Sequence, residues 1–102
     1  MEQIDPNDLL VFARVVAEGS LTAAADKLGL PKSTVSRRLS RLEELLGERL
    51  LLRTTRRLNI TEFGAALLDH ARQLESEVEA VAALAESRQA RPSGRLRVSM
   101  PS

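Results

Sequence analysis

Apolar side chains near the start of the chain recur at the three- and four-residue spacing of an amphipathic helix. The predicted helix begins at Pro6, with Asp5 as its N-terminal cap, and ends at Gly19. Proline suits the first helical position because its missing N–H would have no partner there. The predicted buried face consists of Leu9, Phe12, Ala13 and Val16.

A second, shorter helix is predicted over residues 21–28, with Ser20 as its cap. Small side chains at Ala24 and Ala25 allow another helix to approach closely. Gly29 then permits the positive φ that a tight turn often requires. These features indicate that the next helix crosses this one at short range.

A third helix is predicted from Pro31 or Lys32 to Leu46, and Gly47 stops it. Its buried stripe consists of Val35, Leu39, Leu42 and Leu46. Two short helices joined by a tight turn are typical of a helix-turn-helix, whose second helix enters the major groove of DNA. The third helix is therefore the predicted recognition helix.

Two short strands are predicted next, at residues 49–53 and 57–60, with residues 54–56 at the tip of a hairpin. Such a hairpin after a helix-turn-helix is called a wing. The predicted fold is thus mainly α, a winged helix-turn-helix of three helices and a two-stranded wing.

A long helix follows the wing, capped by Thr61 and predicted from Glu62 to Ser87 or Gln89. Its apolar positions alternate in steps of four and three, the heptad pattern of helices that pack along their length. A helix this long cannot bury its whole seam against a domain the size of residues 1–61, so the surplus predicts a second copy of the chain as partner. The predicted dimerisation residues are Leu67, Ala71, Leu74, Val78, Val81 and Ala85.

Residues 91–94 interrupt the helical pattern, and residues 95–101 alternate apolar and polar side chains like the first strand of another domain. Because a lone strand is not stable, we expect the chain to be part of a longer protein. The predicted division is a winged helix-turn-helix at residues 1–61, a linker and dimerisation helix at 62–90, and a hinge with the first strand of a missing domain at 91–102.

Composition narrows the function classes. Phe12 and Phe63 are the only aromatic residues, which favours packed helices, and the absence of cysteine excludes disulfides and thiolate metal sites. No apolar run approaches the ~20 residues that span a membrane, and no signal peptide is visible, which favours a cytoplasmic protein. His70 is the only histidine, and the sequence contains no nucleophile–base pair or metal cluster. We therefore expect neither an enzyme nor a cofactor.

Charge is concentrated in the middle of the chain. The net charge is only +1, but residues 32–57 carry eight basic and three acidic groups and lie between two acidic segments. A localised basic block indicates an anionic partner, and its position on the recognition helix favours double-stranded DNA. A solvated charged face is the alternative interpretation.

The predicted DNA contacts of the recognition helix lie on its polar face. Arg37 is the principal candidate for reading bases, because an arginine can bond to guanine O6 and N7 together. Arg38 and Arg41 are expected either to hold phosphates or to be solvated. The full set of candidates is Lys32, Ser33, Thr34, Ser36, Arg37, Arg38 and Arg41.

Further contacts are predicted outside this helix. The arginines of the wing can reach a narrow minor groove, although one of them could instead pair with Glu48. These wing candidates are Arg53, Arg56 and Arg57. Ser20 and Thr22 are expected either to bind phosphate or to cap the second helix.

In order and spacing, three segments resemble the N-terminal part of LysR-type transcriptional regulators. They are FARVVAEGSLTAAADKLGL from Phe12, STVSRRLSRLEELLGERLLLRTTRRLNIT from Ser33, and TEFG from Thr61. The chain departs from the family at Pro31 and Lys32, where a serine that caps the recognition helix and a glutamine are usual.

The resemblance implies sequence-specific binding of double-stranded DNA by a homodimer, with the recognition helix in the major groove and the wing in the minor groove. It also implies a bacterial regulator with a C-terminal effector-binding domain for a small molecule, and a tetramer in the full-length protein. The alternative is a winged-helix interaction or dimerisation module without DNA binding. Such a module would not need the basic residues concentrated in 32–57.

Overall fold

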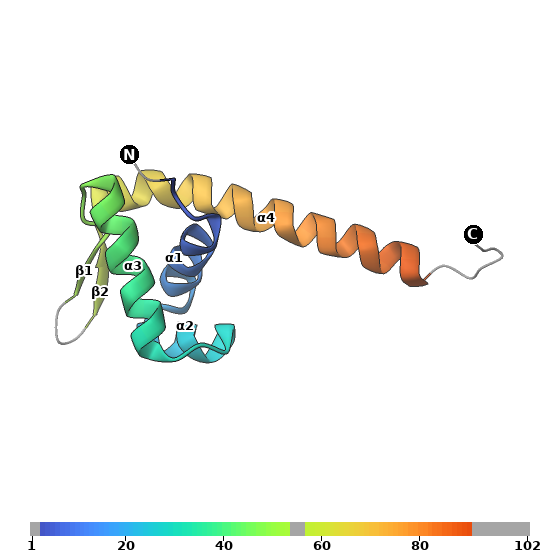
Figure 1. Cartoon of the computed structure of the whole chain (residues 1–102), viewed down its shortest axis with the longest axis horizontal. Coiled ribbons are helices and arrows are strands. Elements are labelled where there is room, and N and C mark those ends of the chain that lie inside the picture. The colour runs from blue at the N-terminus through green and yellow to red at the C-terminus, as the bar shows by residue number, and fades with distance from the viewer. Residues whose placement is uncertain (1–2, 54–56, 91–102) are drawn as a thin grey trace.

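Figure 1 shows the computed structural model of the chain, which describes residues 3–53 and 57–90. The described residues form four helices and a two-stranded antiparallel sheet. In chain order the elements are α1 (Pro6–Glu18), α2 (Leu21–Leu28), α3 (Lys32–Leu46), β1 (Leu51–Arg53), β2 (Leu58–Ile60) and α4 (Glu62–Ala90). The predicted winged helix-turn-helix with a long final helix is confirmed. The predicted hinge and strand at 91–102 lie outside the described residues.

The starts of the first helices follow the local sequence signals. The Asp5 side chain accepts a hydrogen bond from the backbone N–H of Asn7 at 2.9 Å, and Ser20 caps α2 by accepting one from the N–H of Ala23 at 3.0 Å. Pro31 occupies the cap position of α3 and supplies no side-chain hydrogen bond there. The first turn of the recognition helix therefore keeps backbone N–H groups that no side-chain cap engages.

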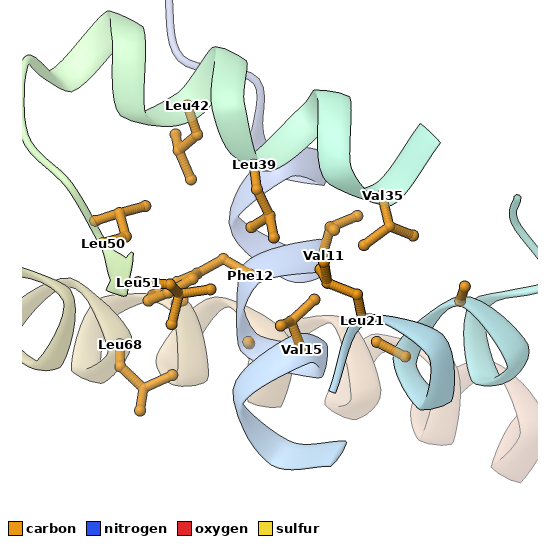
Figure 2. Packing of buried hydrophobic residues seen from close by; sticks show 14 residues of the cluster. Val11, Phe12, Val15, Leu21, Val35, Leu39, Leu42, Leu50, Leu51 and Leu68 are labelled. Carbon is orange, nitrogen blue, oxygen red and sulfur yellow. The ribbon is translucent and has the colours of Figure 1, made fainter. Parts of the chain in front are cut away.

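The core forms where α1 meets the other three helices. Figure 2 shows Phe12 and Val15 of α1 between the buried side chains of α3 and those of α2, α4 and the wing. Phe12, Val15, Val35, Leu42 and Leu50 are fully buried. Because α1 packs against α2, α3 and α4, it is the element that fixes the recognition helix relative to the rest of the domain.

The wing is shorter than predicted. Its strands pair with Leu51 opposite Ile60 and Arg53 opposite Leu58, so β1 begins two residues later than the sequence suggested. At the start of β1 the carboxylate of Glu43 on α3 accepts hydrogen bonds from the backbone N–H of Leu50 at 2.8 Å and from that of Leu51 at 3.3 Å. A side chain of the recognition helix thus holds the start of the wing.

Helix α4 belongs to the domain only in its first half. Figure 1 shows this half beside α1 and the rest extending away from the other elements. Leu68 and Ala71 are buried in the core, whereas Val78, Val81 and Leu84 are 49%, 65% and 61% exposed. Of the predicted seam, Ala71 is therefore covered by the chain's own domain, whereas Val78 and Val81 are uncovered and form an exposed apolar stripe together with Leu84.

Candidate nucleic-acid interface

The outer face of α3 carries basic and hydroxyl side chains. Lys32, Ser33, Arg37 and Ser40 are exposed, and Ser36 is half-buried. Within the described part of the chain, neither Lys32 nor Arg37 forms an ion pair or a side-chain hydrogen bond. Their charges are therefore available to an external anion. Thr34, another candidate, is half-buried.

Arg38 and Arg41 lie on the same helix but are engaged by carboxylates of the N-terminal segment. Arg38 Nη1 donates to Asp8 Oδ1 at 3.0 Å, while Arg41 donates to the same carboxylate through Nε at 3.0 Å and Nη2 at 2.9 Å. Asp5 lies 3.5 Å from Arg41 and 3.9 Å from Arg38. The carboxylate of Asp8 is fully buried, so this ion-pair cluster connects α1 to the recognition helix.

Asp8 was not among the predicted functional residues, although the sequence carries a signal for it. Asp8 precedes Val11, Phe12 and Val15 by three, four and seven residues, so it lies on the buried face of α1. A carboxylate in that position requires cationic partners, because an uncompensated buried charge is costly. Identifying which arginines supply them required the packing of α1 on α3.

Of the three candidate arginines of the wing, only Arg57 has both its backbone and its side chain among the described residues. Arg57 is exposed just before β2, whereas Arg56 and the side chain of Arg53 lie outside what the structure describes. Just before β1, an ion pair joins Arg49 Nε to Glu43 Oε2 at 3.5 Å. Glu48, the carboxylate expected as an alternative partner of a wing arginine, is exposed.

The remaining candidates are placed at the start of α2 and on α4. Ser20 acts as the cap of α2, and Thr22 is exposed in its first turn. His70 is exposed on α4. The described residues contain no group of three or more potential metal ligands, and none of the described helices has the length and hydropathy that a membrane crossing requires.

Two helices at a tight turn, an exposed basic face on the second and an antiparallel wing define a winged helix-turn-helix DNA-binding domain. The family model for bacterial regulatory helix-turn-helix proteins of the lysR family matches residues 6–65. The chain belongs to this family.

Similar proteins agree with this assignment. An HTH-type transcriptional regulator of Xanthomonas campestris pv. campestris is 47% identical over 97 residues, covering 95% of this chain and 28% of that protein. The regulator PtxR of Pseudomonas aeruginosa is 41% identical over 101 residues, covering 99% of this chain and 32% of that protein. The chain thus spans about a third of the length of these curated relatives.

Solved structures show the same fold. A crystal structure of a BenM_DBD/catB site 1 DNA complex has a TM-score of 0.73 and 33% identity, covering 86% of this chain and 99% of that one. Full-length LysG from Corynebacterium glutamicum has a TM-score of 0.72 and 30% identity, covering 86% of this chain and 30% of that one. The similarity therefore includes a protein solved with DNA.

Proposed function

We propose that the chain binds double-stranded DNA sequence-specifically as the N-terminal part of a bacterial transcription regulator. The observation that carries the proposal is the outer face of α3, where Lys32 and Arg37 are exposed and pair with no other described residue. The hydroxyls of Ser33 and Ser36 lie near them on the same helix. In the major groove, Arg37 reads base edges while the shorter side chains allow close approach.

The wing provides the second contact in this proposal. Its candidates are Arg53 at the end of β1, Arg57 just before β2, and Arg56, which lies outside the described residues; a minor groove of negative potential attracts arginine side chains. Ser20 and Thr22 are candidates for phosphate contact at the start of α2. Ser20 already uses its hydroxyl oxygen as an acceptor, but the hydroxyl proton remains for donation to a phosphate.

We further propose that two chains associate through the uncovered half of α4. Val78, Val81 and Leu84 form an exposed apolar stripe on a described helix of 29 residues. A second α4 packed on this stripe would place two recognition helices on one duplex and give an interrupted inverted repeat as the operator. The chain spans about a third of these relatives, which supports a further domain in the whole protein. From the membership of the family we further propose that this domain binds a small-molecule effector, that the full protein is a tetramer, and that it acts in the bacterial cytoplasm.

Retention on immobilised random duplex DNA tests the proposal. We expect retention at low salt and a steep loss of binding as salt rises, because phosphate contacts release counterions. Selection from a random duplex pool should then yield a single inverted repeat. A folded chain that is not retained at low salt would instead be the winged-helix interaction module.

A further inference from the structure

The buried carboxylate of Asp8 neutralises positive charge on the recognition helix. It is fully buried, whereas the side chains of its partners Arg38 and Arg41 are 32% and 49% exposed. Arg41 contacts the carboxylate through both Nε and Nη2, a fork geometry that is stronger and more directional than a single contact. Asp5 adds a second carboxylate beside the same two guanidinium groups.

This arrangement divides the cations of α3 into two kinds. Arg38 and Arg41 are matched by the two carboxylates of Asp5 and Asp8, so the cluster has no net charge. Arg37 and Lys32 have no such partner among the described residues. Adjacent arginines of one helix therefore differ in what they can offer to DNA.

We propose that Asp8 is a specificity-determining residue, which holds Arg38 and Arg41 back from phosphate contact and so limits sequence-independent affinity. This inference rests on the proposed DNA binding and refines it. Contacts to phosphates raise the affinity for every duplex alike, whereas discrimination comes from contacts to base edges. If Arg38 and Arg41 are held away from phosphates, the affinity for every duplex falls, whereas the discrimination between bases that Arg37 provides is unchanged.

The test is the salt dependence of binding to a random duplex by the parent chain and by Asp8→Asn. Asparagine has nearly the same shape but no charge, so both arginines lose their ion pair with residue 8 and keep only Asp5 beside them. Each new phosphate contact adds about 0.9 to the slope of log affinity against log salt, so release of one arginine adds about 0.9 and release of both adds about 1.8. For a fourfold rise in salt, Asp8→Asn should lose about 3- to 12-fold more affinity than the parent loses. At low salt it should bind the random duplex more tightly than the parent.

Two further variants assign the effect to the cluster. Asp26→Asn removes one exposed negative charge from α2 and should leave the slope unchanged. In the Asp8→Asn background, Arg41→Gln should remove about half of the added slope, because Arg41 is one of the two released cations. A folded Asp8→Asn protein with the slope of the parent, or a shallower one, would overturn the inference.

Circular dichroism and thermal unfolding show whether Asp8→Asn is folded at the binding temperature. If it is not, Asp5→Asn decides, because asparagine caps a helix as well as aspartate and Asp5 is not fully buried. For Asp5→Asn, the slope of log affinity against log salt should be steeper than that of the parent, by a smaller amount than is expected for Asp8→Asn. A slope equal to that of the parent would overturn the inference. If the parent itself fails to bind any duplex, the proposed function fails instead.

Discussion

The carboxylate of Glu43 accepts a hydrogen bond from the backbone N–H of Leu50 at 2.8 Å, joining the end of the recognition helix to the start of the wing. Leu50 is fully buried, so its N–H needs a partner within the protein. We expect Glu43→Ala to lower the free energy of unfolding by about 1–3 kcal/mol, because a buried donor is left unsatisfied. Chemical denaturation measures this change.

Glu44→Ala is the matched control for this prediction. Glu44 is the adjacent residue of α3, is exposed and forms no described ion pair. Its substitution should change the unfolding free energy by less than about 0.5 kcal/mol. Equal losses for the two variants would show that Glu43 does not stabilise the wing through these hydrogen bonds.

Gly64 in the first turn of α4 makes a close approach to the wing. A Cβ atom at this position would collide with the backbone carbonyl of Leu50 and lie 2.9 Å from Cγ1 of Ile60. We therefore expect Gly64→Ala to destabilise the domain by about 1–3 kcal/mol, although alanine is the better helix former by about 1 kcal/mol. Ser76→Ala, exposed on the same helix, should be neutral or slightly stabilising in the same denaturation experiment.

The helices could be predicted well because their boundaries depend on neighbouring residues. Asp5, Ser20 and Thr61 cap through hydrogen bonds that span two or three residues, and Gly19 ends α1 with a φ of 79°. Helical spacing also identified Phe12, Ala13, Val35, Leu39 and Leu42 as buried, but on α1 it was wrong at two positions, because the structure buries Val11 and Val15 and leaves Leu9 and Val16 only partly buried. Local chemistry of this kind is fully contained in the sequence.

The contacts between elements could not be predicted in the same way. Helical spacing places Arg37, Arg38 and Arg41 alike on a polar surface, but only the packing of α1 shows that two of them meet Asp8. Likewise, the heptad pattern does not show that Ala71 is already fully buried within its own chain. Both distinctions depend on residues more than twenty positions apart, which periodicity does not relate.

Arg37 should contribute to DNA recognition in a way that no other described arginine of α3 does. We expect Arg37→Ala to weaken binding to the selected operator by about 1–3 kcal/mol and to relax the choice of base at one position. Arg72→Ala removes an exposed arginine of α4 and should leave operator affinity unchanged. Titration of the operator and of single-base variants measures both effects. An Arg37→Ala protein with the affinity and base preference of the parent would remove α3 from the proposed interface.

The uncovered stripe of α4 should be required for the proposed dimer. Val78 and Val81 are exposed in the single chain, so glutamates there should not disturb its core, but in a dimer they would be buried as charges. We expect Val78→Glu/Val81→Glu to raise the dimer dissociation constant more than about 100-fold, or about 2.8 kcal/mol. Sedimentation equilibrium measures this constant.

The control for the dimer prediction places the same two charges elsewhere on α4. Ser76 and Ala83 are exposed and lie on the opposite side of the helix from Val78, by the rotation of about 100° per residue. Ser76→Glu/Ala83→Glu should therefore sediment like the parent. If the two double variants have the same dissociation constant, the apolar stripe is not the contact between chains, and the spacing of the two recognition helices must be set by another surface.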